Sequence, residues 1–152
     1  MTIDARIAEL GLTLPEPAKA VANYAPFVQT GDLVHISGQL SNDASGGIKG
    51  TVGADVTPEQ ANAAARLCGV NLLAQIKAAC DGDLSRVVRI VKLGGFVQAG
   101  PDFEAIPAVI NGCSDLMVEV FGDAGRHARS AVGVYKLPLG FAVEVDAIVE
   151  IR

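Results

Sequence analysis

An arginine near the C-terminus stands among small residues in a pattern that suits carboxylate binding. Arg129 lies in a β-rich run, and it shares one face of the strand with Ala131 and Gly133 because alternate strand residues project to the same side. Solvent-facing strand positions usually carry larger polar or β-branched side chains. The small residues therefore indicate that another surface approaches closely and leaves a cavity. A guanidinium there would offer a planar fork of donors that matches a carboxylate.

An acidic residue further along the chain could complete such a site. In residues 141–151, alternation places the valines on one face and Glu144 on the other. If the chain turns near Pro138 into a hairpin, Arg129 and Glu144 project from the same side of the sheet, and the valine side meets the helices. We infer that sheets from several subunits pack on the charged side, with Arg129 at the seam. The alternative is an ordinary surface arginine in an exposed ion pair, which contributes little to stability.

Other residues capable of chemistry have simpler interpretations. His127 lies two residues before Arg129 and could protonate a leaving amine, but it is also typical of a solvated loop. The three cysteines, Cys68, Cys80 and Cys113, are odd in number, and they are interpreted as buried free thiols of a cytoplasmic protein. The sequence contains no C-x-x-C pair and no histidine cluster, so it indicates no metal.

The best-defined element that must position these residues is a long helix. Thr57 can cap it, Pro58 suits the first helical position, and Gln60 can close a capping box. Apolar residues then keep one face over 61–80, and Gly82 stands where a left-handed cap would end the helix.

The remaining elements follow from apolar periodicity bounded by turn formers. They are a short helix at 2–11 with a connector reaching residue 19, strands at 25–29 and 33–38, a loop at 41–50, a strand at 87–97, a second long helix at 106–120, and strands at 128–136 and 141–151. In the strand from Val87, Gly94 and Gly95 indicate a bulge or a close contact. The β-β-α-β-α-β-β order predicts an α/β (α+β) two-layer sandwich, with two helices on one mixed sheet.

The overall composition limits the class of protein. At 152 residues the chain fits a single domain, residues 1–152, and half of its residues are apolar. A net charge of −5 argues against nucleic acid as a partner, because binding a phosphate backbone needs clustered cations. The sequence holds no run of about 18 apolar residues, and its first ten residues lack the apolar stretch of a secretory signal. We therefore expect a cytoplasmic protein that is not in a membrane.

Two separated segments resemble the signatures of the Rid/YjgF family, which includes imine deaminases and endoribonuclease L-PSP-like proteins. The C-terminal segment, HARSAVGVYKLPLGFAVEVDAIVEI, is similar in its A-R-S motif, hydrophobic strand, Leu-Pro and V-E-V strand. The N-terminal segment, VQTGDLVHISGQL, is similar around Ser37-Gly38-Gln39. The element order agrees over residues 20–152, and residues 110–131 resemble a longer subgroup of the family.

The resemblance implies a fold like that of trimeric chorismate mutase, with three clefts between the subunits of a homotrimer. It also implies hydrolysis of small 2-imino or 2-enamino acids to 2-keto acids and ammonia, without a cofactor. Arg129 matches the arginine that binds the substrate carboxylate, and Glu144 matches the glutamate that places the attacking water. Ser37 and Gly38 match a substrate-binding segment in which the absent side chain of glycine lets the ligand come close.

Three positions bear on the substrate. Ala131 stands where many deaminating relatives have cysteine, and Phe27 stands where many have a tyrosine, with Tyr24 nearby. Asn111 corresponds to a polar helix residue beside the cleft. The enzyme interpretation is weighed against a trimeric module that binds keto acids or other carboxylates without turnover. It is also weighed against a ribonuclease, which the acidic balance disfavours, and against a holdase-like chaperone.

Overall fold

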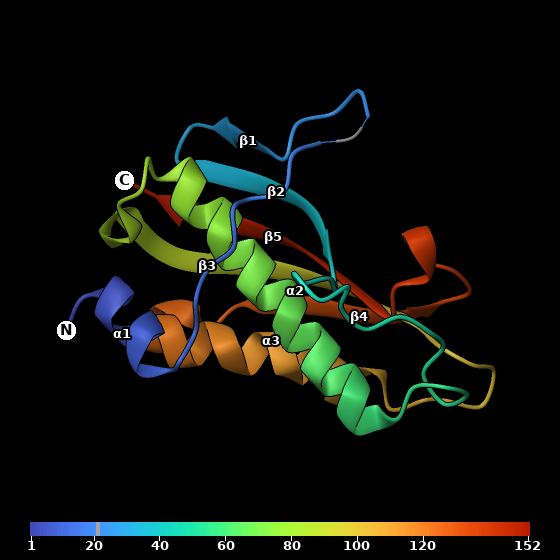
Figure 1. The fold of residues 1–152 in the computed structure, drawn as a ribbon. Coiled ribbons are helices and arrows are strands. Elements are labelled where there is room, and N and C mark those ends of the chain that lie inside the picture. The colour runs from blue at the N-terminus through green and yellow to red at the C-terminus, as the bar shows by residue number, and fades with distance from the viewer. Residues whose placement is uncertain (21) are drawn as a thin grey trace.

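The computed structural model describes residues 1–20 and 22–152, in which three helices cover one face of a five-stranded sheet (Figure 1). The helices are α1 (Ile3–Glu9), α2 (Pro58–Ala79) and α3 (Ile106–Phe121). The strands are β1 (Phe27–Thr30), β2 (Leu33–Leu40), β3 (Val87–Gln98), β4 (Ala128–Val134) and β5 (Val143–Ile151). Short 3₁₀ turns lie at Leu84–Arg86, Gly122–Gly125 and Pro138–Gly140. This arrangement confirms the predicted element order and the two-layer fold.

Helix α2 begins as the local sequence predicts. The Thr57 hydroxyl accepts from the Gln60 backbone N–H at 3.1 Å, and the Gln60 side chain accepts from the Thr57 backbone N–H at 2.9 Å. These two bonds form the predicted capping box, and Pro58 is the first helical residue. The helix ends before Gly82, whose φ of +89° is the left-handed conformation expected of a terminating glycine.

Helices α2 and α3 pack with their backbones in close contact at Gly112. A Cβ added to Gly112 would overlap the backbone carbonyl oxygen of Asn62 on α2. The Asn62 side chain also donates to the Ala108 carbonyl on α3 at 3.0 Å. The position of α3 over the sheet is therefore set by contact with the backbone of α2.

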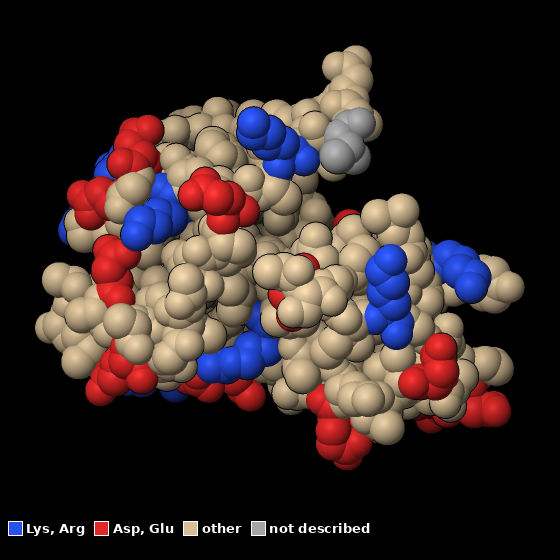
Figure 2. All heavy atoms as spheres, viewed as in Figure 1, with Lys and Arg blue, Asp and Glu red and all other residues tan. Residues whose placement is uncertain are grey.

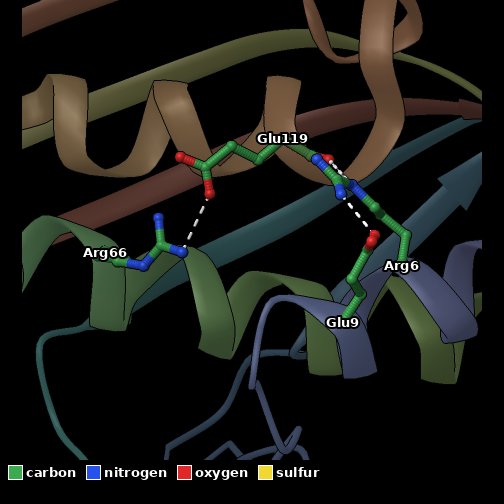
Figure 3. Close-up of polar contacts among 4 residues, drawn as sticks. All are labelled: Arg6, Glu9, Arg66 and Glu119. Atoms are coloured by element: carbon green, nitrogen blue, oxygen red, sulfur yellow. Dashed lines mark hydrogen bonds and ion pairs between the residues drawn. The ribbon is translucent and has the colours of Figure 1, made fainter.

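Charged side chains connect the C-terminal half of α3 to the other two helices (Figure 3). Arg66 of α2 donates to the Glu119 carboxylate at 3.0 Å, and Arg6 of α1 donates to the Glu119 carbonyl at 2.8 Å. Arg6 also pairs with Glu9 at 2.6 Å. The two ion pairs are partly exposed, so they contribute little to stability, and α1 is joined to α3 by the hydrogen bond from Arg6 to the Glu119 carbonyl.

The helix-side surface mixes both signs of charge. In Figure 2, Lys and Arg side chains are interspersed with Asp and Glu over a surface that is mostly uncharged. Among residues 1–20 and 22–152, no helix combines the length and the apolar character that crossing a membrane requires. No group of three or more His, Cys, Asp or Glu in that same part of the chain is placed to hold a metal ion.

The predicted hairpin between the last two strands is wrong. The sheet order is β1-β2-β5-β3-β4, so β3 lies between β4 and β5. β4 pairs in parallel with β3, and α3 supplies the crossover that a parallel pair requires. The connection from β4 to β5 then passes the end of β3, where the buried Gln98 side chain accepts from the Leu137 backbone N–H at 2.8 Å. β4 is consequently an edge strand.

The predicted faces are right for β5 and wrong for β4. On β5, alternate residues from Val143 to Ile151 are buried beneath the helices, as expected. On β4, Arg129 pairs with Leu93, a fully buried residue on the helix side, so Arg129 also points to the helix side. Val132 instead lies on the open face of the sheet with 46% of its surface exposed.

The small residues of this region make room for α3 of the same chain. A Cβ on Gly95 would lie 2.7 Å from the Ile110 side chain, and one on Gly133 would lie 3.4 Å from the Ile106 side chain. α3 of the same chain therefore covers this side of β4 around Arg129 and Ala131, and contact with a second subunit at Arg129 stays a prediction. Of the two interpretations of Gly94-Gly95, close contact is correct, because pairing is regular there and the register shifts lie at residues 87–92.

Candidate functional site

Arg129 is held on the edge strand by two side chains of α3. Its NH1 group donates to the Asn111 amide oxygen at 2.8 Å and to the Ser114 hydroxyl at 3.2 Å. Asn111 and Ser114 are three residues apart, so they face the same side of the helix. Among the residues that the structure describes, these bonds use only NH1. A guanidinium has five N–H donors, so the Nε and NH2 edge is left for a planar, bidentate anion.

Ser37 and Gly38 lie in an interruption of the sheet. The pairing of β2 with β5 shifts between Ile36 and Gln39, which is a β-bulge. The Ser37 hydroxyl donates to the Ala25 carbonyl at 2.7 Å, so this side chain is fixed. A cavity of about 200 Å³ opens here, and both Ser37 and Gly38 line it.

Glu144 lies directly against this bulge. A Cβ added to Gly38 would overlap the Glu144 carboxylate, so only glycine permits the contact. Burial raises the pKa of the Glu144 carboxyl above its ordinary value, and the neighbouring Asp146 carboxylate raises it further. Burial also raises the pKa of Asp146, partly offset by a hydrogen bond from the Gly94 backbone and by Lys92. Two neighbouring carboxyl groups with raised pKa values are suited to exchanging protons closer to neutral pH.

Arg129 and Glu144 nevertheless lie on opposite faces of the sheet. Arg129 is on the helix side of edge strand β4, whereas Glu144 is on the open side of β5, next to Phe96. The expectation that both project from one side of the sheet is therefore wrong for a single chain. That expectation assumed that β4 and β5 pair directly as a hairpin. In such a hairpin, the register between the two strands would have placed Arg129 and Glu144 on the same side.

The open face carries apolar side chains that the described helices do not cover. Val28 and Leu33 are 57% and 37% exposed, and they lie on the same face as Glu144 and the exposed Val132. Exposed apolar groups on a bare sheet face are typical of a surface that packs against another protein surface.

Comparison with known proteins identifies the family. Residues 4–150 match the sequence model described as YjgF/chorismate mutase-like, with endoribonuclease as its proposed activity. The chain belongs to the YjgF family. The resemblance found in the two sequence signatures is thereby confirmed.

Several relatives of this YjgF-family chain span nearly its whole length. Protein TCP17 of Trypanosoma cruzi is 48% identical over 152 residues, covering 99% of this chain and 94% of that protein. The crystal structure of Atu1372 from Agrobacterium tumefaciens, a protein of unknown function, is 50% identical with a TM-score of 0.93, covering 99% of this chain and 92% of that one. The 2-iminobutanoate/2-iminopropanoate deaminase of Dermatophagoides farinae is 27% identical over 141 residues, covering 93% of this chain and 95% of that protein.

The structure also resembles a solved protein that carries the family name. The YjgF gene product of E. coli is 28% identical with a TM-score of 0.63, covering 91% of this chain and 97% of that one. This likeness confirms the predicted YjgF/chorismate mutase-like fold.

Other predicted site residues of this YjgF-family chain lie in different surroundings. Phe27 pairs with Ile36 and packs against the core, away from the Ser37–Gly38 cavity. Tyr24, which is 55% exposed, lines that cavity instead. Ala131 lies on the helix side of β4, next to Arg129 along the strand, and packs against the core.

Two residues of these sites were not predicted from the sequence. Ser114 contacts Arg129, and its spacing of three residues from Asn111 on a helix was the available signal. Lys19, in the N-terminal connector, lines the cavity at Ser37 and Gly38, but nothing in the local sequence joins the connector to this site. The three cysteines are free and buried, as predicted, and burial raises the pKa of the Cys113 thiol to about 12.

Glu144→Gln is expected to stabilise this YjgF-family chain increasingly as pH rises. A carboxyl whose pKa is raised on folding binds more protons in the native state than in the unfolded state, so the free energy of unfolding falls as pH rises from the ordinary carboxyl range through the raised pKa. Glutamine does not titrate, so the variant does not show this fall in the free energy of unfolding. Thermal unfolding should therefore show a Tm a few degrees above the wild type at pH 8 and a smaller difference at pH 5. Glu104→Gln, at an exposed position, is the control, and an equal Tm difference at both pH values would contradict the expectation.

Proposed function

We propose that the protein is a cofactor-free hydrolase that converts small 2-imino or 2-enamino acids to 2-keto acids and ammonia. The observation that carries this proposal is Arg129, whose NH1 group is fixed by Asn111 and Ser114 while its Nε and NH2 edge is left for a carboxylate. The deaminase of Dermatophagoides farinae, a relative over most of the chain, supports the reaction class.

The active unit in this proposal is a homotrimer. Because Arg129 and Glu144 lie on opposite faces of the sheet in one chain, they can act on one substrate only if a second copy supplies one of them. The exposed apolar residues Val28, Leu33 and Val132 lie on the open face, and contact between copies there would bury them. Such packing brings the Glu144 side of one sheet toward the β4 edge of the next.

The proposed mechanism uses orientation and one proton carrier. Arg129 holds the substrate carboxylate, so the C=N carbon lies at a fixed distance from a water molecule near Glu144. The imine reacts in its protonated form, C=NH2+. Glu144 takes a proton from this water as the water oxygen bonds to the carbon, and the C=N π electrons move to nitrogen, which gives a neutral carbinolamine. Protonated Glu144 then returns its proton to the amine nitrogen, the C–N bond breaks to release ammonia, and the hydroxyl group loses its proton to solvent as the 2-keto acid forms. Orientation supplies most of the rate gain, because the imine is already electrophilic.

A direct assay tests this function. Alanine is oxidised in situ by an amino-acid oxidase to give 2-iminopropanoate, and loss of the imine is followed with and without the purified protein. Hydrolysis that accelerates in proportion to protein concentration is the expected result. If the protein binds pyruvate and leaves the imine lifetime unchanged, it is a carboxylate-binding module and the enzyme proposal is wrong.

The proposed trimer is tested separately by measuring the oligomeric state. Size-exclusion chromatography with light scattering should give a particle of three 15.6 kDa chains. A protein that remains monomeric at high concentration would contradict the proposed site, since one chain does not bring Arg129 and Glu144 to the same face.

A further inference from the structure

Both ring nitrogens of His127 are engaged in hydrogen bonds. Nδ1 lies 2.6 Å from the Gly125 carbonyl oxygen, and Nε2 lies 2.9 Å from the Ser114 hydroxyl oxygen. A carbonyl oxygen only accepts, so Nδ1 must carry the hydrogen. In the neutral imidazole, Nε2 is then an acceptor, and the Ser114 hydroxyl donates to it.

These bonds give Ser114 a fixed orientation toward Arg129. With its hydrogen directed at His127, the Ser114 oxygen presents lone pairs to Arg129 NH1, which donates to it at 3.2 Å. Donation therefore runs in one direction, from Arg129 to Ser114, to His127 and to the Gly125 carbonyl. Hydrogen bonds that run in series in this way polarise and strengthen one another.

The far end of this series is fixed by backbone packing. A Cβ added to Gly125 would overlap the Met117 carbonyl oxygen, so the turn at Gly122–Gly125 rests directly on the backbone of α3. His127 and Arg129 are two residues apart where the chain enters β4, so both point toward α3. α3, which carries Asn111 and Ser114, therefore also fixes the positions of the Gly125 carbonyl and His127.

We propose that Ser114 and His127 are positioning residues that hold the Arg129 guanidinium ready for a carboxylate. This inference rests on the proposed function of Arg129 as the carboxylate anchor. NH1 has two hydrogens, and one bond to Asn111 alone would leave the guanidinium plane free to turn about it. The second bond, to Ser114, fixes the plane, so the Nε and NH2 edge is already oriented when the ligand arrives. Ordering a flexible arginine in advance lowers the entropic cost of binding.

This role also explains why His127 is a poor choice for the acid that protonates a leaving amine. Its two nitrogens are committed to Gly125 and Ser114, both parts of the same chain. His127 therefore acts on the ligand only through Ser114 and Arg129.

The test compares variants of the full-length protein in binding pyruvate, measured by calorimetry, and in hydrolysing 2-iminopropanoate. Ser114→Ala and His127→Phe should each weaken pyruvate binding about tenfold, in the range expected for a lost hydrogen bond to a charged group. KM should rise by a similar factor with little change in kcat, because the anchor binds the carboxylate equally before and during the reaction. The double variant should bind pyruvate no more weakly than Ser114→Ala does, since both changes interrupt the same series of hydrogen bonds. Ser45→Ala, in the exposed loop before α2, is the matched control.

Two further measurements separate the possible failures. Arg129→Ala should abolish pyruvate binding, and if it does not, the proposed function itself is wrong. If Arg129→Ala abolishes binding while Ser114→Ala and His127→Phe bind like Ser45→Ala, or if their effects add, the positioning role is overturned. The wild type gives an independent answer, because ¹⁵N NMR of the neutral His127 ring should show the Nδ1–H tautomer. An Nε2–H tautomer would overturn the proposal without any substitution.

Discussion

Arg129→Lys is expected to lower kcat/KM for 2-iminopropanoate by about 10²- to 10³-fold, although the positive charge is kept. The guanidinium bonds Asn111 and Ser114 through NH1 and offers a second planar edge to the ligand. A lysine ammonium is a point charge without this fork, so it loses the bidentate pairing and the fixed orientation together. Two charge-assisted hydrogen bonds account for a loss of this size.

The matched control for this substitution is Arg126→Lys. Arg126 is only three residues away, and it pairs with Asp123 at 3.3 Å in an ion pair that is largely exposed. Its replacement should leave kcat/KM within about twofold of the wild type, because exposed pairs contribute little. Imine hydrolysis at the wild-type rate in Arg129→Lys would show that charge alone is sufficient, and the fork argument would then be wrong.

Gly112→Ala is expected to lower the free energy of unfolding by about 3 kcal/mol, which is near the upper end for an overpacked core. The added Cβ would overlap the Asn62 carbonyl oxygen, and this backbone group cannot rotate away as a flexible side chain would. The helices must separate instead, which loosens the buried contact between α2 and α3. Alanine's better helix propensity offsets only about 1 kcal/mol of a larger steric cost. For a chain of this size, Tm should fall by roughly 6–12 °C.

Gly100→Ala provides the comparison for Gly112→Ala. Its added Cβ would meet the Val52 carbonyl oxygen at 3.5 Å, an ordinary contact, so Tm should change little. Gly112→Ala should also weaken pyruvate binding, because Asn111 and Ser114 move with α3. A Gly112→Ala protein with wild-type Tm would show that the two helices can separate without cost, and the packing account would have to be abandoned.

Local sequence determined several elements of this protein without help from tertiary contacts. The capping box of Thr57 and Gln60 fixed the start of α2, because its bonds join residues only three apart. Alternation fixed which residues of β5 share a face, because successive strand residues point to opposite sides. Residue type and local surroundings likewise marked Arg129 and Glu144 as candidate site residues.

Long-range pairing decided where those two residues stand. Nothing within residues 128–151 specifies that β3 inserts between β4 and β5, since strand neighbours are chosen by contacts across the whole chain. That pairing turned Arg129 toward α3 and left Glu144 on the opposite face, beside Gly38. It also brought Ser114 and His127 to the guanidinium from separate elements. The sequence by itself determined the chemical groups and the local elements, whereas the tertiary structure decided which groups meet, because strand order and helix packing depend on contacts between distant residues.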